Sequence, residues 1–253
     1  MPLNHQLVPK LKNLRLSGIL ATLDVRTQQA ITERLSYVEF LERLIEDEVE
    51  RRTQKQLQRR LRRAAVDLDK TLEGFDFGFN PSINRQQIFD LATCHFVERH
   101  ESLLIQGPTG VGKSHLAHAL GHEACRRGFD VLFVSAARML AHLHGGRADG
   151  TYERRLLTYS RPDVLVIDEF GLKPLPPAGP EDFYDVITER YERGALIITS
   201  NRAFAEWPDL FQSPLLASAA LDRLAHHAHQ IVITGDSFRA KGRRRGGSER
   251  SES

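Results

Sequence analysis

Short apolar runs alternate with longer segments of mixed polarity from residue 102 onward. The apolar runs are Ser102–Gln106, Val131–Ser135, Val164–Ile167, Ala195–Thr199 and Gln230–Thr234. Runs of Val, Ile and Leu without polar alternation are typical of strands that are buried on both faces, and the segments between these runs have a helical composition. The pattern therefore predicts an α/β fold with a five-stranded, mainly parallel sheet that is covered by helices.

The N-terminal region shows a helical pattern instead. Ser36 and Glu39 have the spacing of a capping box, and Leu35 and Phe40 have the positions of a hydrophobic staple around it. Beyond this cap, apolar residues recur at helical spacing and predict a long helix that runs towards Ala65. These apolar residues are Val38, Leu41, Leu44, Ile45 and Val49.

Glycine, proline and phenylalanine interrupt the pattern over Glu73–Asn84, as is typical of a connector. We therefore expect a small all-helical N-terminal domain over residues 1–73 and an α/β domain over residues 74–240. Residues 241–253 are rich in Gly, Ser and Arg and are expected to form a disordered basic tail. Three aromatic residues alternate in the connector: Phe75, Phe77 and Phe79. Their rings either lie beside a nucleotide base or pack against the core, and we favour packing.

The composition is typical of a reduced, cytoplasmic protein. Hydrophobic residues make up 41% of the chain, enough for a buried core, and no apolar stretch is long enough to span a bilayer. The N-terminus lacks the charged-then-apolar pattern of a secretory signal. The two cysteines, Cys94 and Cys125, have no metal-ligand spacing. We expect a cytoplasmic location and no membrane partner.

The net charge of +2 conceals basic ends. Residues 1–73 carry 14 Lys or Arg and 11 Asp or Glu, residues 239–253 carry 6 and 2, and the region between is therefore acidic. The predicted long helix is acidic in its first half and then carries seven bases with no acid between them: Arg51, Arg52, Lys55, Arg59, Arg60, Arg62 and Arg63. A helix dipole favours this order of charges, but so dense a run favours contact with the phosphates of a polyanion.

The residues after the first apolar run carry the strongest chemical signal. Residues 107–114 match G-x-x-x-x-G-K-[ST] at every fixed position, between a predicted strand and a predicted helix. Glycines in such a loop let successive N–H groups face an anion, while Lys113 reaches the β- and γ-phosphates and the Ser114 hydroxyl binds Mg²⁺. The sequence therefore predicts a site for ATP and Mg²⁺, formed by Gly107, Pro108, Thr109, Gly110, Val111, Gly112, Lys113, Ser114 and His115.

Two further predicted strands end in polar residues. Asp168 and Glu169 directly follow the third apolar run, about fifty residues after the phosphate loop. Asp168 is expected to hold Mg²⁺, and Glu169 to polarise the water that attacks the γ-phosphate. Asn201 follows the fourth run and could hydrogen-bond that water or the γ-phosphate, although asparagine at such a position is also common in β-turns.

Several basic residues flank the last predicted strand. Arg223 precedes it and Arg239 follows it, and either could stabilise the charge that develops during phosphoryl transfer or could form a surface salt bridge. His226, His227 and His229 lack Cys or Asp partners at metal-site spacing, and we expect them to be structural.

With these motifs assembled, the chain resembles the IstB-like family of transposition helper ATPases, which are relatives of the DnaC and DnaI helicase loaders within the AAA+ class. The resemblance extends from about Leu11 to Lys241. Its most specific stretches are GPTGVGKSHLAHALG at 107–121, IDEFG at 167–171, TSNRAFAEW at 199–207, LDRLAHHA at 221–228 and GDSFRAK at 235–241. LSYVEFLERLIEDEVERR at 35–52 and FDFGFNPSINR at 75–85 also resemble this family and differ from the loaders.

The resemblance implies an AAA+ P-loop sheet in which the strand before Asn201 lies between the P-loop strand and the Asp168 strand. Asn201 and Glu169 would then lie near one γ-phosphate. The resemblance matches Arg223 to the arginine finger, which acts on ATP in the neighbouring subunit, and Arg239 to the second sensor. It therefore implies a homo-oligomer whose subunit interfaces are bridged by ATP.

The expected function is that of an ATP-hydrolysing AAA+ protein that binds duplex DNA without sequence preference. It would assist the transposase of the same element in selecting and using target DNA, and so take part in DNA recombination. One alternative is a helicase loader of the DnaC or DnaI kind that acts on a replicative helicase. Another is a nucleotide-gated DNA-binding scaffold in which hydrolysis is incidental.

Overall fold

The computed structural model describes residues 4–235 and 237–238. The chain divides into two compact units, Met1–Arg59 and Arg60–Ser253, which are described separately. Within the described part of the chain, no helix combines the length and the apolar composition that crossing a bilayer requires.

The first unit consists of α1 (Asn4–Asn13), α2 (Ser17–Glu33) and most of α3 (Tyr37–Ala64). The predicted capping box of α3 is confirmed, because the Ser36 N–H donates to Glu39 Oε2 (2.7 Å) and the Glu39 N–H donates to Ser36 Oγ (3.3 Å). A small apolar core joins the three helices through Leu11, Leu23 and Leu44. This arrangement agrees with the all-helical N-terminal region that the sequence predicts.

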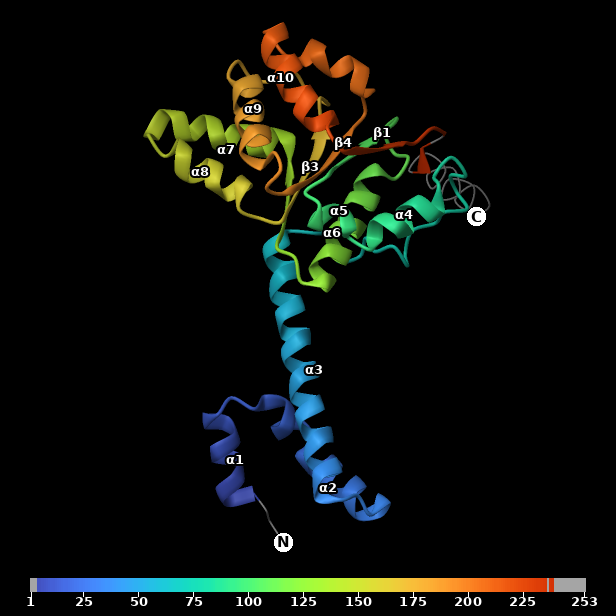
Figure 1. Ribbon diagram of the computed structural model, residues 1–253, viewed down its shortest axis with the longest axis vertical. Helices are drawn as coiled ribbons and strands as arrows, with labels where there is room; N and C mark the ends of the chain where they lie inside the picture. Colours follow the sequence, from blue (N-terminus) through green and yellow to red (C-terminus); the bar gives the residue numbers. More distant parts are fainter. Residues whose placement is uncertain (1–3, 236, 239–253) are drawn as a thin grey trace, which may run out of the picture. The chain divides into compact units, whose positions relative to one another are not determined.

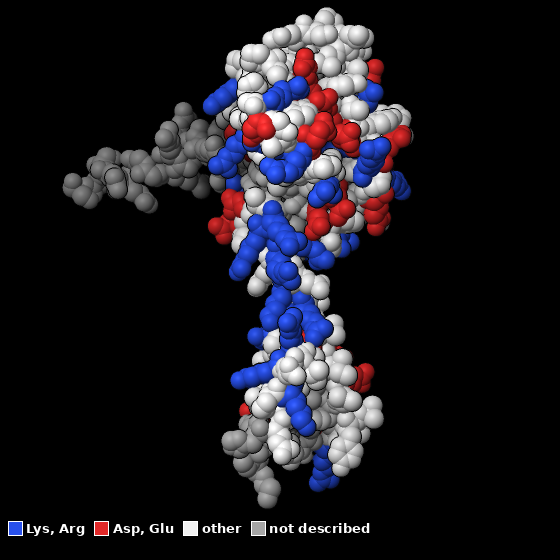
Figure 2. Space-filling model, turned by 90° about the vertical axis from the view of Figure 1, so that its left-hand side faces the viewer, with Lys and Arg blue, Asp and Glu red and all other residues white. Residues whose placement is uncertain are grey.

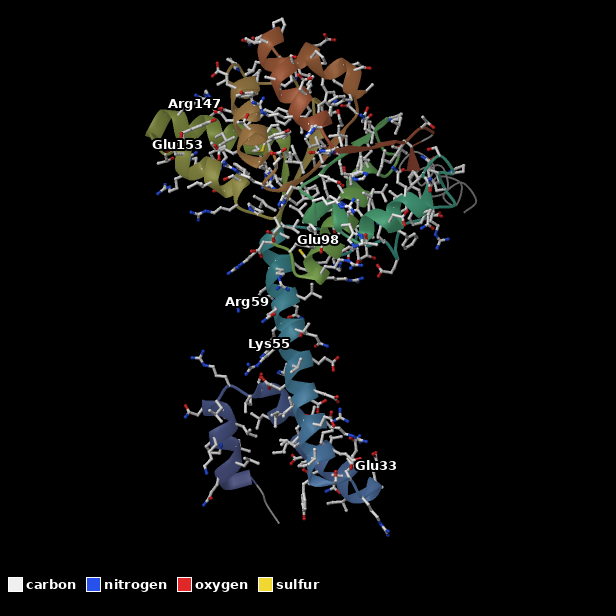
Figure 3. All side chains as sticks on the ribbon, in the orientation of Figure 1. Glu33, Lys55, Arg59, Glu98, Arg147 and Glu153 are labelled. Carbon is white, nitrogen blue, oxygen red and sulfur yellow. The ribbon has the colours of Figure 1, made fainter. Side chains whose placement is uncertain are left out.

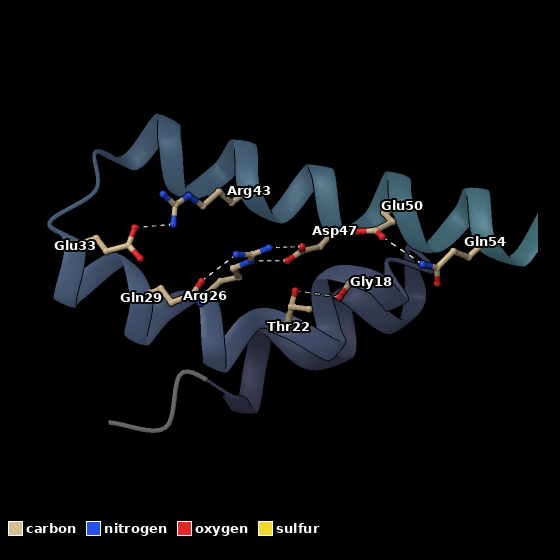
Figure 4. Close-up of polar contacts among 9 residues, drawn as sticks. All are labelled: Gly18, Thr22, Arg26, Gln29, Glu33, Arg43, Asp47, Glu50 and Gln54. Atoms are coloured by element: carbon tan, nitrogen blue, oxygen red, sulfur yellow. Dashed lines mark hydrogen bonds and ion pairs between the residues drawn. The ribbon is translucent and has the colours of Figure 1, made fainter.

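Polar contacts fix α2 against α3 (Figure 4). The Gly18 N–H donates to the buried Glu48 carboxylate (2.5 Å), and a Cβ at Gly18 would lie 2.5 Å from the Glu48 Cα. Arg26 forms a bidentate pair with Asp47, at 2.9 and 2.7 Å, which lowers the pKa of that carboxyl to about 2. The position of residue 18 therefore requires glycine, because the two helix backbones approach too closely for a side chain.

The second unit is an α/β sandwich. Its strands are β1 (Ser102–Gln106), β2 (Val131–Ser135), β3 (Val164–Phe170), β4 (Ala195–Ser200) and β5 (Ala228–Val232). Its helices are α4 (Arg85–Ala92), α5 (His95–Glu98), α6 (Lys113–Arg127), α7 (Ala136–Asp149), α8 (Tyr152–Ser160), α9 (Gly179–Arg190), the 3₁₀ helix η1 (Phe204–Leu210) and α10 (Pro214–Ala225).

The five strands pair in the order β2-β3-β4-β1-β5, and all the pairings are parallel. This confirms the predicted sheet, and it confirms that β4 lies between β1 and β3, as the resemblance implies. The last strand begins two residues earlier than the apolar run suggests, because Ala228 pairs with Ser102 and the ladder ends at Val232. β3 continues past its apolar residues to Phe170, so Asp168 and Glu169 belong to the strand itself.

Helices cover both faces of the sheet (Figure 1). Successive side chains of a strand point to opposite faces. In β3, Leu165 and Ile167 pack into the core formed with α7, α8, α9 and α10, whereas Val166 lies near Gly121 of α6 on the other face. The sheet is therefore buried on both sides, and the loops at its carboxyl edge carry the polar residues that the sequence singles out.

Residues 60–75 pack along α6 and belong to the second unit. Ala64 is buried, Val66 contacts the position of Gly121, and Arg126 pairs with Glu73 (2.8 Å). The division into compact units therefore falls at Arg59, within α3, earlier than the domain boundary expected after residue 73. The physical reason is that the last turn of α3 and the chain beyond it bury their apolar residues against α6.

Candidate nucleotide site

The predicted phosphate loop lies between the end of β1 and the start of α6. Gly107 has φ +148° and Gly110 has φ +87°, backbone conformations that side-chain-bearing residues rarely adopt. A Cβ at Gly107 would lie 2.1 Å from the carbonyl oxygen of Ile233, and a Cβ at Gly110 would lie 2.1 Å from the Ser237 hydroxyl. The loop is thus shaped by a close approach to the chain that follows β5.

Three neighbouring side chains connect the loop to the carboxyl ends of β3 and β4. The Ser114 hydroxyl donates to Asp168 Oδ1 (2.9 Å). The Thr199 hydroxyl donates to the same oxygen and also accepts the backbone N–H of Glu169 (3.0 Å). Asp168 is thereby oriented from two sides, and Glu169 is held by its backbone in a left-handed conformation (φ +60°) with its carboxylate exposed.

Thr199 is a site residue that the sequence motifs did not single out. The available signal was its polar side chain near the end of an otherwise apolar strand. Thr199 reaches Asp168 and Glu169 only because β4 pairs with β3. The residues around Thr199 in the sequence do not reveal that pairing.

The oxygen ligands of this cluster fit a magnesium ion that is shared with a nucleotide. The described residues contain no group of three His, Cys, Asp or Glu side chains that could hold a metal by themselves. Ser114 and Asp168 offer a hydroxyl and a carboxylate within hydrogen-bond distance of each other. Mg²⁺ typically takes one or two such protein ligands and completes its shell with phosphate oxygens and water, so this donor set suits Mg²⁺ bound together with phosphates.

A cavity of about 270 Å³ opens beside the loop. Phe75 lies against Gly112 and packs edge-on against His115 (ring centroids 5.1 Å apart), and Phe79 packs against Phe238 (4.9 Å). These aromatic rings line the cavity together with residues 110–115, so apolar ring faces and the polar groups of the loop meet in one hollow. Such a hollow can hold an aromatic base next to a phosphate chain.

The connector is also fastened to the chain after β5. Asn80 Nδ2 donates to the Thr234 carbonyl (2.7 Å), and the Thr234 N–H donates to Ser82 Oγ (3.2 Å). The Phe238 N–H donates to the Gly110 carbonyl (2.9 Å). Segments that are more than 120 residues apart in the chain therefore meet at one side of the phosphate loop.

Lys113 begins α6, and its Nζ donates to the Pro108 carbonyl (2.7 Å) at the far side of the same loop. Its ammonium group therefore lies inside the turn of the loop, where a phosphate chain would be bound.

Histidines hold α6 against residues 67–71. His115 Nε2 lies 2.9 Å from the Thr71 carbonyl, and the Asp67 N–H donates to His118 Nδ1 (3.0 Å). The His118 ring stacks on Phe133 at 3.7 Å. Burial, aided by Lys70, lowers the pKa of His118 to about 4, so its imidazole is neutral and accepts the hydrogen bond at neutral pH.

The low pKa of His118 predicts a loss of stability in acid. An imidazole in the unfolded chain has a pKa of about 6.5, so the unfolded state gains a proton first as the pH falls. The stability that His118 contributes is present above about pH 6.5 and is lost as the pH falls towards 4. His118→Gln, whose amide oxygen can accept the same N–H, is expected to reduce the pH dependence of the free energy of unfolding between these values. Denaturant titrations at several pH values measure this; an unchanged dependence would contradict the assignment.

Asn201 directly follows β4 and is exposed at the same edge of the sheet as Asp168 and Glu169. The strand order therefore brings together the predicted Lys113, Ser114, Asp168, Glu169 and Asn201. Arg239 lies outside the described residues.

Arg223 lies elsewhere. It is near the end of α10 and lines a small hollow with Ser102 and Leu196, which stand at the starts of β1 and β4. The phosphate loop follows the other end of β1, and each strand residue advances about 3.3 Å, so Arg223 is remote from the loop of its own chain. The structure thus does not bring Arg223 to the cluster around Asp168.

The three histidines near the last strand make ordinary structural contacts. His226 Nδ1 lies 3.0 Å from the Tyr191 hydroxyl, and His229 Nε2 lies 2.6 Å from Glu101 Oε2. His227 packs against His226 with ring centroids 4.0 Å apart. No candidate metal cluster includes these side chains among the described residues.

Comparison with known sequences gives one family for almost the whole chain. Residues 9–246 match the family described as IstB-like ATP binding protein. The chain is 43% identical, over 92% of its length and 93% of the relative's, to a protein of Mycobacterium tuberculosis named for ATP binding in an insertion sequence. It is 38% identical, over 96% of its length and 92% of the relative's, to the ATP-binding protein named for insertion sequence IS21 of Pseudomonas aeruginosa.

Solved structures share the fold of the second unit. The DnaC helicase loader superposes with a TM-score of 0.58 over 66% of this chain and 97% of that chain, at 24% identity. AMPPCP-bound DnaA from Aquifex aeolicus superposes with a TM-score of 0.56 over 73% of this chain and 56% of that chain, at 21% identity. These similarities show an AAA+ P-loop fold.

Proposed function

Because this chain belongs to the family of IstB-like ATP-binding proteins, we propose that it hydrolyses ATP and uses the cycle to bind duplex DNA and assist a transposase. The observation that carries the proposal is the convergence of the phosphate loop, Asp168 and Thr199 on neighbouring strands. The family description supports ATP binding itself; hydrolysis, DNA and the transposase are the finer steps that we propose.

Each residue of the cluster has a chemical task in this proposal. Lys113 and the N–H groups of the loop bind the β- and γ-phosphates, and Ser114 and Asp168 hold Mg²⁺. The bound ion would neutralise phosphate charge as the bond to the leaving group breaks. Glu169 accepts a hydrogen bond from the attacking water and increases its nucleophilicity, and Asn201 orients the same water or the γ-phosphate.

Arg223 is proposed to act on the nucleotide of a neighbouring subunit. Its distance from the loop of its own chain, across the length of β1, supports action in trans. A cation placed against the γ-phosphate stabilises the charge of the transition state, and it also links two subunits only while ATP is present. We therefore propose a homo-oligomer whose interfaces depend on ATP.

The proposed DNA contact is the basic stripe on α3, which we define as Arg51, Arg52, Lys55, Arg59, Arg62 and Arg63. Successive helix residues are about 100° apart, and these six positions fall on one side of the helix, whereas Arg60 points elsewhere, near Gly128. All six are exposed. Figure 2 shows Lys and Arg side chains gathered along this helix, and Figure 3 shows Lys55 and Arg59 extending from the same side. A row of cations without base-reading residues suits the phosphate backbone of DNA of any sequence.

Neutralising the stripe is expected to weaken DNA binding on all sequences alike. Replacing Arg59, Arg62 and Arg63 with Gln should flatten the plot of log affinity against log salt by about 0.9 for each phosphate contact removed. Arg60→Gln is the control for the loss of one positive charge from the same helix outside the stripe, and it should leave the slope at the parental value. Fluorescence anisotropy on two unrelated duplexes over a range of salt measures both effects. Equal slopes for the triple variant and the parent would exclude the stripe as a DNA surface.

The names of the relatives support a transposase as the partner, because those proteins are named for insertion sequences. The likeness to a helicase loader concerns the fold and supports the alternative partner less. Co-purification with ATP separates the two: we expect the tagged protein to retain the transposase of its own element and not the replicative helicase. Retention of the helicase alone would favour the loader function.

A further inference from the structure

Arg223 is held by its neighbours, and none of its partners among the described residues is acidic. Its Nη1 donates to the Ala219 carbonyl one turn earlier in α10 (2.7 Å). The guanidinium carbon lies 5.4 Å from the ring centroid of Tyr184, which stands in the middle of α9. No carboxylate of the described residues lies within ion-pair distance of Arg223, in contrast to Arg147, whose guanidinium lies over Tyr152 but is paired with Asp182 (2.7 Å).

An aromatic partner suits a cation that must later meet a phosphate. The face of a tyrosine ring attracts a guanidinium within about 6 Å and orients it, but leaves its full positive charge in place. A carboxylate would neutralise the charge and compete with the phosphate for the same N–H groups. Arg147 has both an aromatic ring and a carboxylate as partners, whereas Arg223 has the aromatic ring and, among the described residues, no carboxylate.

Tyr184 is itself anchored next to the catalytic strand. Its neighbour Phe183 is fully buried and stacks on Phe170, with ring centroids 4.3 Å apart and planes inclined by 21°. Phe170 directly follows Glu169 in β3, and its carbonyl accepts a hydrogen bond from the Ser200 hydroxyl (2.8 Å). The stacking of Phe183 on Phe170 therefore anchors α9, and with it the backbone of Tyr184, against the strand that carries Glu169.

We propose that Tyr184 is a positioning residue for Arg223, which orients the guanidinium towards the γ-phosphate of a neighbouring subunit. This inference rests on the proposed function, in which Arg223 acts in trans. Within one subunit, the contact between Phe170 and Phe183 links the end of β3 to α9, whose Tyr184 contacts Arg223. In the proposed oligomer, that subunit presents Arg223 to the nucleotide of its neighbour.

Substitution of Tyr184 separates its role as an aromatic partner from its role in packing. Tyr184→Phe keeps the ring and is expected to keep ATP turnover. Tyr184→Leu keeps an apolar side chain but removes the ring face, and turnover should fall about fivefold, the ratio that corresponds to about 1 kcal/mol, with ATP affinity unchanged. Turnover and nucleotide affinity are measured on proteins whose thermal unfolding matches the parent. Equal turnover of the Leu and Phe variants would overturn the inference.

A double-mutant cycle tests whether Tyr184 acts through Arg223. In an Arg223→Ala background, Tyr184→Leu should cause no further loss, because the group that it positions is gone. A further loss of the same size as in the parent would mean that Tyr184 acts independently of Arg223, and it would overturn the inference. Tyr152→Leu is the matched control: it removes the ring beneath Arg147, and turnover of the folded protein should not change.

The same set of variants distinguishes this inference from the function on which it rests. Parental turnover of Arg223→Ala would contradict the trans-acting arginine, and the Tyr184 inference with it. Low turnover of Arg223→Ala together with parental turnover of Tyr184→Leu would leave the proposed function intact and overturn only the positioning role.

Discussion

The Glu169→Gln protein is expected to bind ATP and to assemble, but to hydrolyse ATP at least about a hundredfold more slowly than the parent. Glutamine keeps the size of the side chain but cannot draw a proton from the attacking water. The backbone of residue 169 is held by the Thr199 hydroxyl and not by its own side chain, so the substitution should leave the loop in place. Single-turnover hydrolysis and equilibrium binding of a fluorescent ATP analogue measure the two properties separately.

Lys113→Ala is expected to lose ATP binding and not only hydrolysis. The ammonium group of Lys113 meets phosphate charge in the ground state as well as in the transition state, so its removal should abolish both ATP binding and ATP-dependent assembly. Hydrolysis near the parental rate by the Glu169→Gln protein would show that another group polarises the water. If that protein lost hydrolysis but still supported transposition in full, the scaffold alternative, with incidental hydrolysis, would be favoured.

Arg223→Ala is expected to bind ATP normally and to lose turnover by about three orders of magnitude, the lower range for loss of an arginine finger. Mixing it with Lys113→Ala should restore part of the activity. In a mixed oligomer, the Lys113 variant supplies an intact Arg223 and the Arg223 variant supplies a loaded nucleotide site. The geometry favours this outcome because Arg223 lies at the amino ends of β1 and β4, away from the loop of its own chain.

The mixing experiment is read from ATP turnover across ratios of the two variants, at a protein concentration where oligomers form. Turnover should peak when both variants are present in comparable amounts. Mixed oligomers are verified by co-purification through a tag on one variant. A flat baseline in verified mixed oligomers would assign Arg223 to a role within its own subunit.

The fold and the cluster at the carboxyl edge of the sheet were largely predictable because their signals are local. An apolar run buried on both faces specifies a parallel strand, and a glycine-rich turn before a helix specifies an anion loop. The capping box of α3 is likewise contained in four consecutive residues, Ser36 to Glu39. The end of the sheet was less predictable, because an edge strand such as β5 has one pairing partner and its ends depend on that ladder.

Contacts between distant segments were not predictable from the residues alone. Thr199 becomes a site residue only when β4 lies beside β3, and Tyr184 becomes a partner of Arg223 only when α9 packs on α10. The hydrogen bond from Asn80 to the Thr234 carbonyl joins residues 154 positions apart. The attachment of residues 60–73 to α6 depends on long-range contacts, such as those of Val66 with Gly121 and of Asp67 with His118, which leave no periodic pattern in the sequence. Composition therefore placed the expected boundary after residue 73, whereas the compact units divide at Arg59.

The strand order also has a consequence for biosynthesis. β1 pairs with β4 and β5, so both of its ladders can form only after Leu196 and Ala228, the partners of Ser102, have been synthesised. Chains are made from the N-terminus, and non-local pairings form slowly. The residues of the phosphate loop are therefore synthesised early, but the contacts that shape the loop can form only late. A chain that stopped before Ala228 would contain every residue of the loop, but neither the Ile233 carbonyl that packs against Gly107 nor the Thr234 carbonyl that Asn80 binds.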